Sequence, residues 1–197
     1  MIKKVERQDY LEASELIYDT STSLSTFLFG GREKSIPKIQ TLIAMGDNSF
    51  GHETIYGYYQ EKELVGLYNG YTGEKKKRYD SVDLRAFARA LGIVKAAELV
   101  AKSPILNRLL TSDVENDEFY LSNLIVNTAF RRRSIGRSLL QHAIETAKEK
   151  GSTAVILDVN TTNEGAITLY KKMGFIITKK KGIPFMNEAT YTMRMEV

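Results

Sequence analysis

Four arginines lie where a helix is expected to begin: Arg131, Arg132, Arg133 and Arg137. Gly136 lies among them. The first turn of a helix has backbone N–H groups without intrahelical acceptors, and the helix dipole adds positive charge there. Guanidinium groups pair with phosphate oxygens through two parallel hydrogen bonds, and a glycine lets a ligand approach the backbone closely. The segment therefore predicts a pyrophosphate site. A solvated basic helix start is the alternative, and this turn alone does not decide between them.

Other chemistries are disfavoured by what the sequence lacks. Neither the G-x-G-x-x-G pattern of dinucleotide sites nor the P-loop pattern occurs. The 197 residues include no cysteine, which excludes disulfides, zinc–thiolate sites and cysteine nucleophiles. His52 and His142 are the two histidines, so we expect no metal site.

The composition is typical of a soluble globular protein, with 43% hydrophobic residues, 26% charged residues and a net charge of +4. The opening MIKKVERQDY does not resemble a signal peptide, and no apolar run approaches the ~20 residues that span a bilayer. We therefore expect a cytoplasmic protein without a membrane partner.

The elements that position the basic turn follow from hydrophobic spacing. We predict strands at 2–5, 119–127, 153–159, 175–179 and 189–197, and a hairpin of 53–60 with 61–73. We predict helices at 9–18, capped by Asp9 with Leu11, Leu16 and Ile17 buried, at 33–45, from the arginines to about Lys150, and from Asn163 to Gly174. Residues 20–31 are expected to form a turn and 74–81 a solvated loop, and one or two helices are expected over 83–110, broken near Gly92 and Ser103–Pro104.

These elements predict one α/β domain over residues 1–197 with a mixed sheet and a helical insert at about 74–118. The nearly all-apolar strand at 153–159 is expected to lie in the middle of the sheet.

Two motifs resemble a known family. The segment VNTAFRRRSIGRSLL resembles the acetyl-CoA-binding signature of the GNAT N-acetyltransferases, Arg/Gln-x-x-Gly-x-Gly/Ala, over residues 131–136. The segment NEGAITLYKKMGF resembles the family's second signature, with matches at Asn163, Ala166, Leu169, Tyr170, Gly174 and Phe175. The clear resemblance covers residues 120–177. One departure is Ser134, which occupies the first glycine position and would either crowd a pyrophosphate or donate its hydroxyl to it.

The resemblance implies a GNAT fold, with a mostly antiparallel sheet splayed between its fourth and fifth strands and helices on both faces. It implies that acetyl-CoA is the cosubstrate, that its pyrophosphate lies on the basic turn, and that the main chain of 124–126 pairs with its pantetheine arm. The implied cofactor-binding residues are Leu124, Ile125, Val126, Arg131, Arg132, Arg133, Ser134, Ile135, Gly136, Arg137, Ser138, Asn163, Ala166 and Tyr170. Dimers are common in the family, so the resemblance leaves a homodimer open.

Acetyl transfer to an amine needs a neutral amine and a proton for the leaving thiolate. The resemblance places Tyr170 as the general acid, and a tyrosine that only packs beneath the sheet is the alternative. It places Asp158 as the base, acting through water. A structural role for the Asp158 side chain, capping the turn that follows, explains the residue equally well. Glu118 and Glu53 are fallback bases. Because the chain has no cysteine to carry an acetyl group, we expect direct attack by the bound amine.

The acceptor is not identified, although basic surroundings slightly favour an acidic molecule or protein tail, with Arg85 and Arg89 of the insert among its walls. A non-catalytic acyl-CoA-binding or sensing module on the same fold is the second hypothesis. Nucleic-acid binding through the lysine runs at 75–77 and 179–181 is the third and least favoured, because solvated faces explain these runs. We expect His142 to lie on a helix surface.

Overall fold

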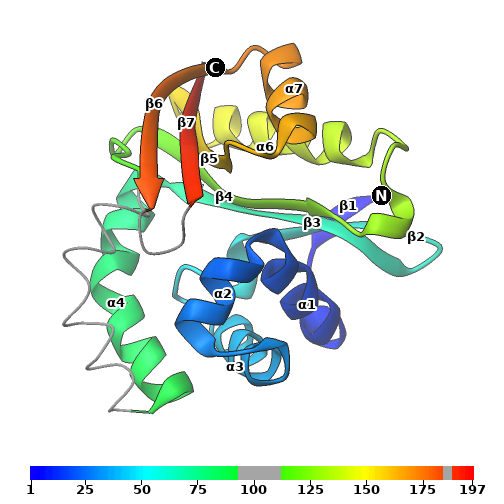
Figure 1. The fold of residues 1–197 in the computed structure, drawn as a ribbon, viewed down its shortest axis with the longest axis vertical. Coiled ribbons are helices and arrows are strands. Elements are labelled where there is room, and N and C mark those ends of the chain that lie inside the picture. The colour runs from blue at the N-terminus through cyan, green and yellow to red at the C-terminus, as the bar shows by residue number, and fades with distance from the viewer. Residues whose placement is uncertain (93–111, 184–187) are drawn as a thin grey trace.

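The computed structural model describes residues 1–92, 112–183 and 188–197. A seven-stranded sheet runs through these residues in the order β1-β2-β3-β4-β5-β7-β6 (Figure 1). Its strands are β1 (Ile2–Lys4), β2 (Ile55–Gln60), β3 (Glu63–Thr72), β4 (Glu118–Val126), β5 (Ala154–Asn160), β6 (Ile176–Ile183) and β7 (Glu188–Glu196). All neighbouring strands are antiparallel except β4 and β5, which confirms the mixed, mostly antiparallel sheet.

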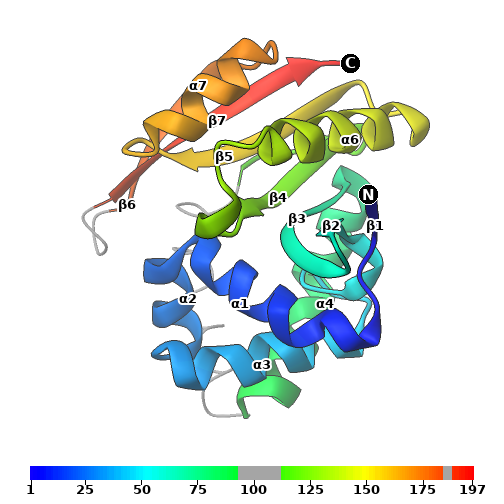
Figure 2. The same cartoon turned by 90° about the vertical axis from the view of Figure 1, so that its right-hand side faces the viewer.

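Helices cover both faces of this sheet (Figures 1 and 2). On one face lie α6 (Ile135–Glu149) and α7 (Glu164–Lys172), and on the other lie α1 (Tyr10–Thr20), α2 (Thr22–Phe29), α3 (Arg32–Met45) and α4 (Gly73–Leu91). Short 3-10 turns occur at Arg7–Asp9, His52–Thr54 and Thr128–Phe130. Because each face needs its own apolar cover, the protein has two main hydrophobic clusters, one on each side of the sheet.

Consecutive side chains along a strand point to opposite faces of the sheet. Val155, Leu157 and Val159 of β5 pack with α6 and α7, while Ala154 and Ile156 face the opposite side. This two-sided burial explains why the strand is nearly all apolar, and it confirms that β5 lies inside the sheet.

The hairpin of β2 and β3 is confirmed. Its tip consists of Glu61 and Lys62, with φ angles of 49° and 75°. Two successive residues with positive φ give the turn a twist that matches the flanking strands. The charged tip is thus a tight two-residue turn.

Two expectations for the N-terminal half are wrong. Residues 20–31 contain the helix α2, because Ser25 and Phe29 share a buried side and Gly30, at φ 101°, ends the helix. Leu11 of α1 is 46% exposed, and the buried side of that helix is made by Ala13, Leu16 and Ile17. Both errors come from local spacing, which does not reveal where the neighbouring helices pack.

The expectation of a solvated loop at 74–81 is also wrong, because α4 already begins at Gly73. The Thr72 side chain accepts a hydrogen bond from the Lys75 backbone at 3.4 Å, which caps the helix. Lys76 and Tyr79 are buried one turn apart. The helix ends at Gly92, as expected, and the predicted helical stretch beyond it, with its break at Ser103–Pro104, lies outside the described residues.

Candidate active site

The sheet opens between β4 and β5. Their parallel pairing runs from Glu118 and Ala154 to Leu121 and Leu157 and then ends (Figure 2). At the same point β4 carries an extra residue, Ser122, since its neighbours pair with consecutive residues of β3. Such a bulge bends the strand. The predicted splay between the fourth and fifth strands is therefore confirmed.

A cavity of about 690 Å³ occupies this opening and runs toward the start of α6. Most of the expected site residues line it: Leu124, Ile125, Val126, Arg131, Arg132, Ser134, Ile135, Gly136, Arg137, Asp158, Asn163, Ala166 and Tyr170. Residues from the basic turn, from the splayed strands and from α7 thus share one cavity, as the two motifs together predict.

The backbone of the basic turn is shaped for an anion. Arg132 and Ser134 have positive φ angles of 65° and 60°, and Ser134 is the N-cap of α6 without a side-chain capping bond. The backbone N–H groups of Ile135, Gly136 and Arg137 begin the helix and have no acceptor within it. The left-handed conformation at Ser134 explains why a glycine suits this position.

The packing around Gly136 leaves room for a side-chain Cβ atom. A Cβ atom added there would meet Leu169 Cδ2 at 3.6 Å and Val126 Cγ2 at 3.7 Å, which are ordinary contacts. Its φ is not in the left-handed region either. Neither packing nor backbone conformation therefore requires a glycine here, and its effect is to leave the backbone at the helix start uncovered by a side chain.

The arginines do not act alike. Arg132 and Arg137 line the cavity, and Arg131 does so while its Nε donates to the Val126 carbonyl at 3.1 Å. Arg133 lies over the Phe130 ring, 5.3 Å from its centroid, and is not part of the lining. Ser138 is also outside the lining, and its hydroxyl donates to the Ser134 carbonyl at 3.3 Å. Arg133 and Ser138 are thus expected site residues that the fold turns elsewhere.

The backbone of β4 beyond the bulge has one free edge. On its other edge, Leu124, Ile125 and Val126 pair with β3. On the edge toward β5, the described residues provide no strand partner after Leu121. Main-chain groups here are therefore open to an extended amide-containing ligand, except that the Val126 carbonyl already accepts from Arg131.

Tyr170 is carried by α7, whose start is fixed by the Asn163 side chain accepting from the Ala166 backbone at 3.2 Å. The tyrosine is 6% exposed and packs against Phe175. Burial raises the pKa of Tyr170 to about 12. Its hydroxyl has no hydrogen-bond partner among the described residues, and the side chain lines the cavity. At neutral pH it is a protonated donor whose hydrogen bond is not used by the described part of the protein.

Asp158 lies one residue past the last pair of β4 and β5, on the opposite face of the sheet from Tyr170. Its carboxylate accepts from the Ser112 hydroxyl at 2.6 and 2.8 Å, from Thr192 at 2.7 Å and from Tyr120 at 3.1 Å. Lys181 Nζ in turn donates to the Ser112 hydroxyl oxygen at 3.3 Å. The carboxylate is thus held rigidly at the border of the cavity by three hydroxyl groups.

The fallback carboxylates lie elsewhere. Glu118 is buried and forms an ion pair with Arg194. Glu53 accepts from the Asp47 backbone at 2.7 Å and from the Tyr79 hydroxyl at 3.3 Å. Neither residue lines the cavity, so each has a structural explanation of its own.

Three basic side chains are less solvated than expected. Lys76 and Lys181 are only 8% and 9% exposed, so the lysine runs are not wholly solvated faces. His142 is half-buried, and its Nδ1 lies 2.8 Å from the Tyr68 hydroxyl. In each case a neighbouring element covers the side chain, which local sequence does not reveal.

Some cavity residues were not predicted from the sequence. They are Asp19, Thr20, Leu121, Ser122, Phe130, Leu157, Val159, Asn160, Gly165, Thr168, Leu169 and Lys172. Phe130, Gly165, Thr168, Leu169 and Lys172 lie within the two motif segments, so the motifs located them without assigning them to the site. The others from β4 and β5 lie close to the motifs in the chain. Asp19 and Thr20 come from the end of α1, and no signal in the sequence connects them with the cavity.

Among residues 1–92, 112–183 and 188–197, no group of three or more His, Cys, Asp or Glu side chains is placed to hold a metal ion. Within the same residues, no helix has both the length and the apolar character needed to cross a membrane.

Comparison with curated proteins finds relatives for the C-terminal motifs. An "[Ribosomal protein bS18]-alanine N-acetyltransferase" of Salmonella typhimurium is 41% identical over 59 residues, which are 30% of this chain and 40% of that protein. An N-alpha-acetyltransferase of Arabidopsis thaliana is 36% identical over 61 residues, 31% of this chain and 32% of that protein. The chain therefore matches less than half the length of these relatives.

Solved structures share the fold over the whole chain. An N-acetyltransferase from Staphylococcus aureus has a TM-score of 0.73 at 20% identity, covering 99% of this chain and 100% of the other. The family model described as "Acetyltransferase (GNAT) family" matches residues 35–175. With this match and the splayed sheet, the chain belongs to the GNAT acetyltransferase family.

Proposed function

We propose that the protein transfers the acetyl group of acetyl-CoA to a primary amine by direct attack in a ternary complex. The observation that carries this proposal is the cavity that joins the N-terminus of α6 to Tyr170 on one side of the sheet and to Asp158 on the other. An anion site, an open strand edge, a protonated donor and a carboxylate are the groups that this reaction requires.

The pyrophosphate would bind to the first backbone N–H groups of α6, with Arg132 and Arg137 as side-chain partners. The pantetheine arm would follow the free edge of β4 at Leu124 and Ile125. Arg131 contributes by orientation, because its Nε holds the end of β4 through the Val126 carbonyl. With the cofactor bound in this way, the thioester would lie at the splay, beside Ser122.

The acceptor amine must lose a proton before it attacks. A lysine-like amine with a pKa of about 10.4 costs roughly 4–5 kcal/mol to deprotonate at pH 7, and an N-terminal amine, with a pKa near 8, costs roughly 1 kcal/mol. Asp158 borders the cavity and is the proposed proton acceptor, through a water molecule. Its three hydroxyl partners fix the direction in which its remaining lone pairs point.

The leaving thiolate must gain a proton. Tyr170 is the proposed donor, since its hydroxyl is protonated and unused by the described residues around it. With the pKa of Tyr170 at about 12 and that of a thiol near 8.5, full transfer to a free thiolate is uphill by roughly 5 kcal/mol. Tyr170 therefore acts best by donating a hydrogen bond as the C–S bond breaks, with the proton shared rather than left on sulfur alone.

The bond changes then balance without an acetylated enzyme. The neutral amine forms a C–N bond to the thioester carbonyl and the C–S bond breaks. The nitrogen loses one proton as the amide forms, and the sulfur gains one through the Tyr170 hydroxyl, so coenzyme A leaves as the thiol and Tyr170 ends protonated. A backbone N–H of β4 near the bulge is the proposed donor to the carbonyl oxygen in the tetrahedral intermediate.

The names of the relatives suggest which acceptor to test first. One relative is named for the alanine of a ribosomal protein and another for N-alpha-acetylation. We extend this to the present chain as a proposal that its acceptor is the N-terminal amine of a cytoplasmic protein or peptide. Coenzyme A and this acceptor are the proposed partners.

The experiment incubates cell extract and the full-length protein with isotopically labelled acetyl-CoA and identifies labelled products by mass spectrometry. Purified protein is assayed in parallel for thiol release with an alanine-initiated peptide, a lysine side-chain amine and a polyamine. We expect labelled N-terminal amides and thiol release with the peptide. Tight acetyl-CoA binding without thiol release for any amine would support a non-catalytic acyl-CoA-binding module instead.

A further inference from the structure

The side of Asp158 that faces away from the cavity is connected to a lysine. Ser112, which is 3% exposed, touches both oxygens of the Asp158 carboxylate and also receives a hydrogen bond from Lys181 Nζ at 3.3 Å. A hydroxyl in this position can accept a proton on one side while it donates one on the other. The three groups therefore form a continuous hydrogen-bonded chain that begins at the cavity and ends on β6.

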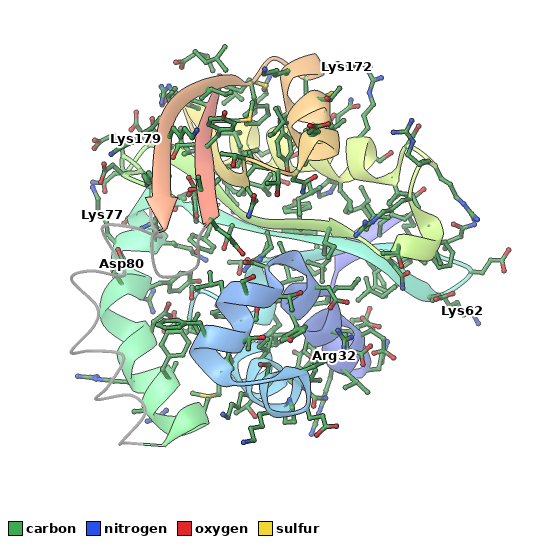
Figure 3. The ribbon with its side chains drawn as sticks, in the orientation of Figure 1. Arg32, Lys62, Lys77, Asp80, Lys172 and Lys179 are labelled. Carbon is green, nitrogen blue, oxygen red and sulfur yellow. The ribbon has the colours of Figure 1, made fainter. Side chains whose placement is uncertain are left out.

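The surroundings of Lys181 favour a neutral amine more than those of an ordinary lysine. Burial lowers the pKa of Lys181, Lys179 and Lys76 lower it further, and Asp158 and Asp113 oppose the change. Figure 3 shows Lys179 on β6 and Lys77 at the start of α4 on the same side of the molecule. Lys76 forms an ion pair with Asp80, with 3.5 Å between Nζ and Oδ2, and this pairing offsets the negative charge of Asp80.

Lys181 belongs to β6, which is the last strand of the sheet, and its side chain is 9% exposed. The hydrogen-bonded chain thus ends at a residue near the edge of the sheet that keeps a small contact with solvent. Thr192 and Tyr120, which also donate to Asp158, come from inner strands; Thr192 touches the Ser112 hydroxyl at 2.9 Å, and Lys76 lies over the face of the Tyr120 ring, 5.9 Å from its centroid. Among these partners of Asp158, Ser112 is the one whose hydroxyl is hydrogen-bonded directly to a lysine nitrogen.

We propose that Ser112 and Lys181 carry the acceptor's proton away from Asp158 toward solvent. This inference rests on the proposed function of Asp158 as the proton acceptor. It adds two relay residues that do not touch the acceptor or acetyl-CoA, and it makes Lys181 a functional part of the reaction.

The proton movement balances in two linked transfers. In the structure the hydrogen bonds run from Lys181 to Ser112 and from Ser112 to Asp158, so the relay requires the Ser112 hydroxyl to turn and donate to the lone pair of neutral Lys181 Nζ. The proton received by the Asp158 carboxylate then moves to the Ser112 oxygen as the Ser112 hydroxyl proton moves to Lys181 Nζ. An O–H bond on Asp158 breaks, an N–H bond on Lys181 forms, and Ser112 ends as a neutral hydroxyl. The Lys181 ammonium then gives its proton to water, and the carboxylate is ready for the next acceptor.

The first test measures thiol release from acetyl-CoA with an alanine-initiated peptide between pH 6.5 and 10. Ser112→Ala and Lys181→Met are compared with Lys180→Met, an exposed lysine of the same strand that lies over the Tyr191 ring. We expect the first two to lower kcat about tenfold at pH 7 with an unchanged KM for acetyl-CoA, and the control to have little effect.

The pH dependence separates a relay from a structural role. The loss should shrink to less than about twofold at pH 10, because the peptide amine, with a pKa near 8, is already neutral there. A loss of equal size at every pH, or a Lys181→Met variant that behaves like the Lys180→Met control, would overturn the relay. Lys181→Gln serves if Lys181→Met does not fold.

A second readout does not need turnover. In full-length protein with isotopically labelled lysine, NMR follows the Lys181 side chain against pH, with Lys181→Met as the assignment control. We expect it to titrate below the usual lysine value, and Asp158→Asn to lower the midpoint further, because the Asp158 carboxylate raises the pKa of Lys181. Ser112→Ala should weaken this response. If Lys181 titrates at the usual lysine value and its midpoint does not change in Asp158→Asn, the relay is refuted. If Lys181 responds to Asp158→Asn but the protein releases no thiol with any amine, only the proposed function is refuted.

Discussion

The two ends of the cavity are built in different ways. The anion end is one continuous segment, residues 131–137, whose backbone turns into α6. At the opposite end the cavity is bordered by Asp158, whose carboxylate is held by a cluster that gathers Ser112, Thr192, Tyr120 and Lys181 from separate strands and from the segment before β4. The anion end therefore depends on one short segment of chain, whereas the environment of Asp158 depends on contacts between segments that are distant in the sequence.

Substitution of Tyr170 by Phe is expected to have the largest effect and to act on chemistry alone. The variant keeps the ring that packs against Phe175 but loses the donor, so we expect kcat to fall about 10²-fold while acetyl-CoA affinity changes less than twofold. Steady-state thiol release and calorimetric titration measure the two quantities. Equal losses in both would mean that Tyr170 is a packing residue.

The raised pKa of the Tyr170 hydroxyl predicts how kcat/KM depends on pH in the alkaline range. Because burial raises the pKa of Tyr170 to about 12, the donor remains protonated across the range in which the acceptor amine becomes neutral. We expect kcat/KM to rise with pH through the amine's pKa, near 8, and to stay level to about pH 10. A fall that begins near pH 9 and disappears in Tyr170→Phe would contradict this assignment.

Gly136→Ala tests the anion end by separating folding from binding. The added methyl makes ordinary contacts in the protein and removes a helical glycine, so we expect unfolding to become about 0.5–1 kcal/mol less favourable. Coenzyme A affinity should fall tenfold or more, because the methyl occupies the ligand's approach to the backbone. Thermal unfolding and calorimetry provide the readouts. Unchanged affinity would remove the pyrophosphate from this helix start.

Arg137→Ala and Arg133→Ala form a matched pair at the same end. Both remove one positive charge, but Arg137 lines the cavity and Arg133 lies over the Phe130 ring. A charge-assisted hydrogen bond contributes roughly 1.5–3 kcal/mol, so we expect about tenfold weaker coenzyme A binding for Arg137→Ala and less than threefold for Arg133→Ala. Comparable losses would indicate a diffuse electrostatic attraction instead of a defined contact.

Ser134→Gly is expected to have the smallest effect. Ser134 adopts a left-handed conformation at φ 60°, and glycine would adopt it without strain. We expect a gain of about 0.5–1 kcal/mol in the free energy of unfolding, since a non-glycine residue in this region costs roughly 1 kcal/mol. Coenzyme A affinity should change less than threefold. A large loss of affinity would assign the Ser134 hydroxyl to the phosphate.

The sequence by itself determined the parts of the protein whose causes are local. The helix start at the basic turn, the Asn163 cap of α7, the Glu61–Lys62 hairpin and the glycine end of α6 each depend on residues within a few positions of one another. The two motifs, one of them with Ser134 in place of a glycine, also located most of the cavity lining. Local hydrogen bonds, φ preferences and helical spacing are contained in a short window, and for this reason they can be predicted from it.

Only the tertiary structure decided which of these side chains meet. It turned Arg133 onto Phe130, brought Asp19 of α1 to the cavity, and buried Lys76 and Lys181, which local polarity places in solvent. It also surrounded Asp158 with hydroxyl groups that lie as many as 46 positions away in the chain. Such contacts depend on the order of the strands and on how the sheet splays, and a strand sequence carries its own alternation but not the identity of its neighbours.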